Sequence, residues 1–261
     1  MLKIGKFVFL TLLAGSASAA VAARHPVEPL EARIIGGNAA SPGEYPSQLS
    51  LQYQARHTCG ASIISEKYAL TATHCVIDRL AEELTIRSGS LDIYGGDLHQ
   101  VINYTTHANY SAFYSSNNDI AIIEVLPEFV YSANVQPITL PNLGDEPAVG
   151  SPATVIGWGR IGVGEPLSDF LKEAVIEIRN QTLCEQIYND IGYDVYPGQI
   201  CADIPEGNLG SCNGDSGGPL FVDGVVHGLV SWAYGCARPG YPTIYNRVAY
   251  YRDWIFEHSG V

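Results

Sequence analysis

Short apolar segments separated by turn residues run through most of this chain of 261 residues. Residues 47–53 show the pattern most clearly, because Leu49, Leu51 and Tyr53 alternate with polar residues and share one face of a strand. Gly, Pro, Asn and Asp cluster between the segments, which is typical of a sandwich or barrel of many short strands. We therefore expect strands over 47–53, 61–64, 84–88, 120–126, 153–157, 174–178 and 225–232.

Helical spacing is found only near the C-terminus. Tyr250, Tyr251, Trp254, Ile255 and His258 recur at intervals of three and four residues, which predicts an amphipathic terminal helix.

The N-terminal residues read as a secretory signal rather than as part of the fold. Lys3 and Lys6 precede the apolar run 7–14, and a tract of small residues follows. The run is too short to cross a bilayer, and no later segment approaches the length needed. We expect a signal peptide over 1–19, a short pro-segment over 20–33 and a secreted, extracellular protein.

Composition agrees with export. The formal net charge of −13 opposes binding to nucleic acid or to an anionic membrane. Six cysteines in an exported chain suggest three disulfides, although spacing alone leaves fifteen pairings open. No Cys-x-x-Cys pair or His-rich cluster indicates a zinc site. Three Asn-x-Ser/Thr sequons, at Asn103, Asn109 and Asn180, are expected glycosylation acceptors.

The most unusual stretch is 210–220, which reads GSCNGDSGGPL. Glycine tolerates backbone angles closed to other residues and leaves main-chain N–H groups uncovered. The N–H groups of Gly214 and Ser216 can then converge on a developing oxyanion. Ser216 would be a nucleophile if a base and an orienting acid lie elsewhere. The alternative is an ordinary Gly-rich surface loop.

Two further segments offer such a base and acid. His74 ends an apolar segment within TATHC, and Asp119 begins one within NNDIAII. An isolated His or Asp of this kind is usually structural. Their order with Ser216, however, is one of the known chain orders of a catalytic triad.

Six motifs together resemble the chymotrypsin/trypsin family of secreted serine endopeptidases, from Ile34 to the end of the chain. They are IIGG at 34–37, TATHC at 71–75, NDIA at 118–121, GWG at 157–159, GDSGGP at 214–219 and SW at 231–232. The resemblance implies an all-β fold of two packed six-stranded antiparallel β-barrels with a C-terminal α-helix. The protease domain would cover 34–261, with the boundary between its halves near 141–152.

The resemblance also implies the chemistry of the site. Ser216 attacks the scissile carbonyl, His74 transfers the proton, and Asp119 orients the imidazole. The N–H groups of Gly214 and Ser216 form the oxyanion hole. The implied disulfides are Cys59–Cys75, Cys184–Cys201 and Cys212–Cys236.

A zymogen is implied as well. Cutting after Arg33 frees the α-amino group of Ile34, which pairs with Asp215 and orders the oxyanion loop, because that carboxylate is costly to bury unpaired. Ser50 and His57 match the positions that restrain this acid before cleavage in chymotrypsinogen. The segment before Arg33 is then an activation propeptide, and a trypsin-like protease is the expected activator.

Specificity departs from trypsin. The pocket-floor position, aspartate in trypsins, is Gly210, and the two wall positions are Ala233 and Thr243. A neutral pocket with added methyl groups favours small to medium apolar P1 residues, with graded preference. Chymotrypsin-like cleavage after Leu, Tyr or Phe is the close alternative, and trypsin-like cleavage ranks third. The other pocket residues implied by the resemblance are Ser211, Asn213, Ser231 and Trp232.

No metal or other cofactor is expected. The family's calcium loop depends on glutamates, and residues 88–99 contain Asp92 and Asp97 but no glutamate. Expected partners are polypeptide substrates, the activating protease and protein protease inhibitors, and we expect a monomer. Family fold does not guarantee family chemistry, so a catalytically silent homologue that acts as a binding protein is the competing hypothesis.

Overall fold

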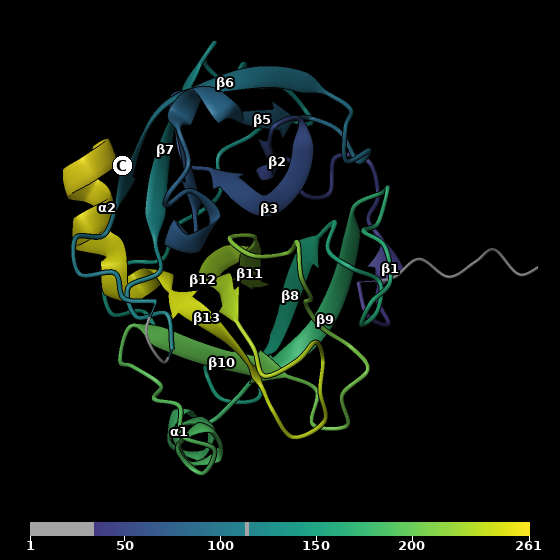
Figure 1. Cartoon of the computed structure of the whole chain (residues 1–261), viewed down its shortest axis with the longest axis vertical. Helices are drawn as coiled ribbons and strands as arrows, with labels where there is room; N and C mark the ends of the chain where they lie inside the picture. The colour runs from purple at the N-terminus through teal and green to yellow at the C-terminus, as the bar shows by residue number, and fades with distance from the viewer. Residues whose placement is uncertain (1–33, 113–114) are drawn as a thin grey trace, which may run out of the picture. The chain divides into compact units, whose positions relative to one another are not determined.

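The computed structural model describes residues 34–112 and 115–261, and most of their regular structure is β-strand (Figure 1). The expected signal peptide, the expected propeptide and Arg33 lie outside the described residues.

The first half of the chain forms a closed antiparallel barrel with strand order β2-β3-β4-β7-β6-β5. The alternation in β2 directs Leu49 and Leu51 into the interior, where they pack with Ile86, Val101 and Ile123. The strands are β2 (Gln48–Tyr53), β3 (Arg56–Ile63), β4 (Tyr68–Thr71), β5 (Leu84–Ser88), β6 (Asp97–Thr106) and β7 (Ala121–Leu126).

The second half forms another antiparallel ring, β9-β10-β13-β12-β11-β8, which the β8–β9 pairing closes. A short strand, β1 (Asn38–Ala39), adds to the outer side of β9. The ring strands are β8 (Pro152–Gly157), β9 (Lys172–Ile178), β10 (Gln199–Asp203), β11 (Pro219–Val222), β12 (Val225–Trp232) and β13 (Thr243–Arg247). The expected pair of six-stranded barrels is confirmed.

Helices are few. The terminal helix is confirmed as α2 (Arg252–Ser259), which follows the 3-10 turn η3 (Val248–Tyr251). The expectation that only this end is helical is wrong, because α1 (Gln181–Asn189) is also an α-helix. Its N-cap is Asn180, whose Oδ1 accepts a hydrogen bond from the N–H of Leu183 at 2.9 Å. Within the described ranges, no helix is long and apolar enough to span a membrane.

One apolar cluster joins the two barrels and α2. Leu70 and Ile122 come from the first barrel, Val226 and Leu229 from the second, and Ile255 from α2. Because the same packed cluster fixes both barrels, loops that leave them near this joint are held at a defined separation.

Candidate active site

The first barrel brings His74 and Asp119 together through one strand pair. His74 lies in the 3-10 turn η1 (Thr73–Cys75) just after β4, and Asp119 lies just before β7. Strands β4 and β7 are antiparallel, with Thr71 opposite Ala121, so the end of one strand meets the start of the other. The Thr73 hydroxyl donates to the carbonyl of Ile120 at 2.7 Å and ties the two segments together.

Two hydrogen bonds connect His74 to the Asp119 carboxylate. The main-chain N–H of His74 donates to Oδ1 at 2.9 Å, and the ring Nδ1 lies 2.7 Å from Oδ2. An ionised carboxylate only accepts, so Nδ1 carries a hydrogen, and in the neutral ring the lone pair is on Nε2. His74 is therefore held in the tautomer that a general base for a hydroxyl requires.

The second barrel completes the surroundings of Asp119, which is fully buried. The Ser231 hydroxyl, from β12, donates to Oδ2 at 2.6 Å. The side-chain amide of Asn246, from β13, donates to the Asp119 carbonyl at 2.5 Å. The carboxylate therefore accepts three hydrogen bonds, and fixed donors of this kind stabilise a buried negative charge.

Ser216 lies on the loop between β10 and β11, which approaches the first barrel closely. A Cβ placed on Gly217, where φ is +76°, would lie 2.1 Å from Thr71 Oγ1, so the position requires glycine. The N–H of Gly60 donates to the Ser216 carbonyl at 2.8 Å. These contacts hold the Ser216 loop against β3 and β4, and Ser216 and His74 line the same cleft.

Two main-chain donors point to an anion site next to Ser216. Among the described residues, the N–H groups of Gly214 and Ser216 have no intramolecular acceptor. His57 fixes the peptide between Gly214 and Asp215, because its Nε2 donates to the Gly214 carbonyl at 2.9 Å. Ser50 Oγ lies 2.9 Å from the other ring nitrogen of His57, and burial lowers the His57 pKa to about 4. His57, bonded in turn to Ser50, thus contacts this loop at the Gly214 carbonyl, and no hydrogen bond within the described residues joins either residue to the Asp215 carboxylate.

Asp215 is a second fully buried carboxylate, directly before Ser216. Its oxygens accept the N–H groups of Gly159 at 2.7 Å and Cys212 at 2.9 Å. No ion pair within the described residues involves it. Burial raises the pKa of Asp215 to about 7, against these two hydrogen bonds, which lower it. A Cβ on Gly159 would lie 2.3 Å from its carboxylate, so the glycine leaves room for the acid.

The start of the described chain lies beside this loop. Ile34 is fully buried in the core of the second barrel, and the Ile35 carbonyl accepts the N–H of Gly210 at 3.2 Å. The segment that follows Arg33 is therefore fixed to the residues that lead into Asp215.

The cleft has a volume of about 410 Å³, and its recess is neutral. All the expected pocket residues line it except Gly210, whose main chain instead bonds Ile35. Among the described residues, the lining contains no carboxylate. The residues that line the recess near Ser216 are Ser211, Cys212, Asn213, Gly214, Val230, Ser231, Trp232, Ala233, Gly235, Cys236 and Thr243.

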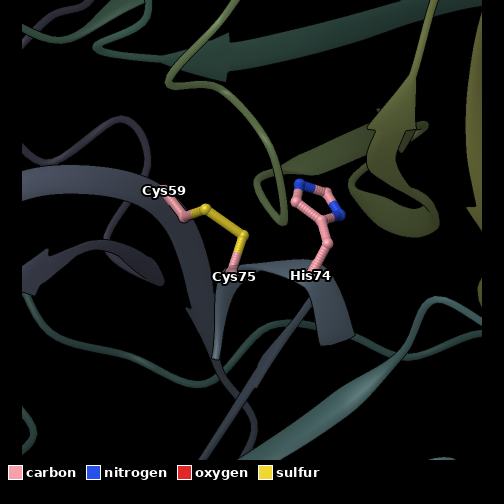
Figure 2. A group of neighbouring side chains, drawn as sticks. All are labelled: Cys59, His74 and Cys75. Atoms are coloured by element: carbon pink, nitrogen blue, oxygen red, sulfur yellow. A yellow bond between two sulfur atoms is a disulfide. The ribbon is translucent and has the colours of Figure 1, made fainter. Parts of the chain in front are cut away.

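The three disulfides are Cys59–Cys75, Cys184–Cys201 and Cys212–Cys236, the same pairs that the resemblance implied. Figure 2 shows the first of them beside His74. Cys59, His74 and Cys75 form the only group of potential metal ligands within the described residues. Both sulfurs are in the disulfide, so the group offers no thiolate to a metal. The sequon residues Asn103, Asn109 and Asn180 are exposed.

Sequence reasoning missed four residues of the cleft, namely Thr58, Arg79, Val230 and Gly235. Thr58 and Arg79 line it on the side of the first barrel. Thr58 lies at a β-bulge: the β2–β3 register passes from Cys59 to His57 without it. A bulge gives no local sequence signal here, and a single arginine five residues after His74 carries none either.

Comparison with known proteins gives one family. The family model described as "Trypsin" matches residues 34–255. A "Trypsin" from Phaedon cochleariae is 39% identical over 233 residues, which cover 87% of this chain and 89% of that protein. A "Fibrinolytic enzyme, isozyme C" from Lumbricus rubellus is 37% identical over 241 residues (87% and 100%). A "Vitellin-degrading protease" from Bombyx mori is 34% identical over 240 residues (91% and 90%).

Proposed function

The chain belongs to the trypsin family of serine endopeptidases, and from that premise we propose that it cuts peptide bonds with His74, Asp119 and Ser216. We further propose that it is secreted as a zymogen and is activated by cleavage after Arg33. The observation that carries the proposal is the His74–Asp119 pair in one cleft with Ser216.

The first step follows from the tautomer of His74. Ser216 Oγ attacks the carbonyl carbon, and its proton passes to His74 Nε2, because Nδ1 is committed to Asp119. Asp119 stabilises the imidazolium that forms. His74 then gives this proton to the leaving amine, and a water molecule repeats the sequence on the acyl-enzyme.

The negative charge that develops on the carbonyl oxygen requires donors that are already in place. The N–H groups of Gly214 and Ser216 supply them, since neither is used within the described residues. Loss of one such donor typically costs about 10²–10³ in kcat. His57 is a positioning residue, because it holds the peptide of Gly214 by its carbonyl.

Activation rests on Asp215. Its buried carboxylate has two N–H donors and, among the described residues, no cation, and its pKa is raised to about 7. Cutting after Arg33 creates an ammonium group on Ile34, in the segment already bonded to Gly210. Pairing of this ammonium with Asp215 stabilises the loop that carries Gly214 and Ser216.

The neutral recess supports small to medium apolar P1 residues. A basic P1 side chain would find no carboxylate in the lining, and the side chains of Ala233 and Thr243 shorten the space available. Each misfitting methylene is worth only about 1–3 kcal/mol, so cleavage after Leu, Tyr or Phe is the alternative. The name trypsin describes those relatives. The P1 preference that we propose for this chain is argued from its own pocket instead.

Mapping of cleavage sites tests the proposal. The full chain is cut at Arg33, the new Ile34 N-terminus is checked by sequencing, and denatured protein is digested, with Ser216→Ala as the control. Cuts after Ala, Val or Leu that are absent in the control are the expected result. Cuts after Lys or Arg would overturn the pocket assignment. No cuts and no labelling by a serine-reactive phosphonate would favour the binding-protein hypothesis.

A further inference from the structure

Among the described residues that line the cleft, one side chain is permanently charged, and that side chain is Arg79. Its Nη1 donates to Thr58 Oγ1 at 3.2 Å, and its guanidinium carbon lies 4.6 Å from the centre of the Tyr53 ring. The Tyr104 hydroxyl donates to the Arg79 carbonyl at 2.7 Å. Arg79 is therefore held in a defined orientation, with most of its five N–H donors still unused.

A second hollow continues from the cleft. It has a volume of about 560 Å³, is lined by Tyr53, Gln54, Arg56, His57 and Thr58, and shares Thr58 with the cleft. Its only permanently charged lining residue is Arg56, which is exposed. The bulge at Thr58 takes this residue out of the β2–β3 register, and Thr58 lies between the cleft and the second hollow.

Neither arginine is neutralised within the described residues. No ion pair there involves Arg56 or Arg79. Glu83 reaches this rim only through Gln54, whose Nε2 donates to Glu83 Oε1 at 3.1 Å, and it lines neither hollow. His57 is neutral near pH 7, because burial lowers its pKa to about 4. The cleft near Arg79 and the adjoining hollow together form a groove. This groove therefore has two cations, Arg56 and Arg79, in a chain of net charge −13.

The position of the groove decides which part of a substrate it meets. Under the proposed function, the P1 side chain enters the recess between Ser211 and Thr243, and the residues before it run along Ser231–Ala233. Thr58 and Arg79 line the cleft on the side of His74 and the first barrel, so under the proposed function they face the residues after the cut bond. We infer that Arg79 and Arg56 make this endopeptidase select peptides with an acidic side chain within the first three residues after the cut bond. Arginine suits this task because its planar donors match a carboxylate.

Paired peptides test this inference, which rests on the proposed function. Each pair shares the residues before the cut bond and differs only by Asp against Asn at one of the first three positions after it. The readout is the Asp-to-Asn ratio of kcat/KM. Both peptides meet the same active enzyme, so the ratio is insensitive to the folded fraction of a variant. We expect a ratio of about five at one position or more, typical of a partly exposed charge pair.

Variants then assign the effect. Arg79→Gln should reduce the ratio to about two. Arg56→Gln combined with Arg79→Gln should bring it to one or below, because the net negative charge then repels the acidic peptide. Arg252→Gln, on α2, removes the same charge away from the groove and should leave the ratio unchanged.

Three results would overturn the inference. A wild-type ratio near one at all three positions, with both peptides cut, overturns it and leaves the endopeptidase proposal intact. An equal reduction by Arg79→Gln and Arg252→Gln assigns the preference to net charge alone. If neither peptide of any pair is cut, the proposed function fails first, and the inference fails with it.

Discussion

Asp119 and Asp215 are both fully buried carboxylates, but their partners differ. Asp119 accepts three hydrogen bonds, from the main chain and ring of His74 and from Ser231. Asp215 accepts two, both from main-chain N–H groups. One partner of Asp119 can itself become a cation, whereas no partner of Asp215 can. Among the described residues, the first acid therefore has a partner that can become positively charged, and the second has none.

The difference assigns separate tasks to the two acids. In the proposed mechanism, Asp119 has a cationic partner each time His74 takes a proton. In the proposed activation, Asp215 would obtain a cation only once, when Arg33 is cut and the ammonium of Ile34 forms. Under the proposed function, the first acid would therefore act in every turnover, and the second would decide whether the loop of Gly214 and Ser216 is in its active arrangement.

Replacing the first acid should have the largest effect. In Asp119→Asn the amide cannot accept from both the ring and the main chain of His74, so the ring loses its fixed tautomer. We expect kcat on a peptide anilide to fall by about 10⁴ at neutral pH. Asp223→Asn, an exposed acid, is the matched control and should retain full activity. A loss below tenfold in Asp119→Asn would mean that Asp119 does not orient His74.

Replacing the second acid, Asp215, should lower stability and activity only after cleavage at Arg33. Asp215→Asn removes the partner of the Ile34 ammonium, and breaking a buried pair costs about 3–5 kcal/mol. We expect the cut form to lose that much unfolding free energy, as measured by urea titration. We also expect it to lose most of its activity, as measured by kinetic assays. The same substitution in an Arg33→Gln background, which stays uncut, should not destabilise the protein. Equal losses in both forms would contradict the activation proposal.

The role of Asp215 was implied only by the family resemblance, whereas His74 and Asp119 also had a signal in their own sequence segments. Two motif glycines lie where a larger side chain would clash with a neighbour. Gly217 faces Thr71, and Gly159 faces the Asp215 carboxylate. Such positions exclude every larger side chain, so the motifs around Ser216 and Asp215 are informative without a structure. His74 and Asp119 were placed by their position at the ends of apolar segments, which β4–β7 pairing brings together.

Other features could not be predicted, because their determinants lie far away in the sequence. The expected strand segments omit β1, β6, β10, β11 and β13. Strand β6 gives no clear apolar alternation because it exposes Leu98 and buries His99, which lies within hydrogen-bond distance of Ser88 and the Pro127 carbonyl. Helix α1 was missed although its cap, Asn180, was noticed as a sequon. The orientation of Arg79 depends on Tyr53 and Thr58 of other strands, so no local pattern reveals it.

The pH dependence of the uncut chain sharpens the comparison. The pKa of Asp215 is raised from its ordinary 3.8 to about 7, so the folded state binds one proton more than the unfolded state between these values. The contribution of Asp215 to stability is thus fully present below pH 3.8 and is lost as the pH rises through 7. The expected slope is about −1.4 kcal/mol per pH unit in that window.

A direct measurement of the unfolding free energy against pH would combine the contributions of Asp215 and His57. The His57 pKa is lowered from 6.5 to about 4, so its contribution has the opposite sign and is lost as the pH falls through the same range. The difference in unfolding free energy between Arg33→Gln and Arg33→Gln with Asp215→Asn cancels His57 and isolates Asp215. Denaturant unfolding at pH 4, 5, 6 and 7 measures it. A difference that is flat with pH would contradict the raised pKa.

The smallest expected effect tests whether all three hydrogen bonds of Asp119 are needed. Ser231→Ala removes the donor at 2.6 Å and leaves both bonds from His74 in place. A hydrogen bond to a charged group is worth about 1.5–3 kcal/mol, and part of the loss is recovered if water reaches the carboxylate.

We expect kcat to fall by about tenfold, with KM nearly unchanged for a substrate without residues that reach β12. Ser132→Ala, which removes an exposed hydroxyl away from the cleft, is the control and should keep its kcat on that substrate. If Ser231→Ala matched Asp119→Asn in its loss, the carboxylate would depend on Ser231 as strongly as His74 depends on the carboxylate. The contrast between a self-sufficient Asp119 and an incomplete Asp215 would then be wrong, because Asp119 too would rely on a single outside donor.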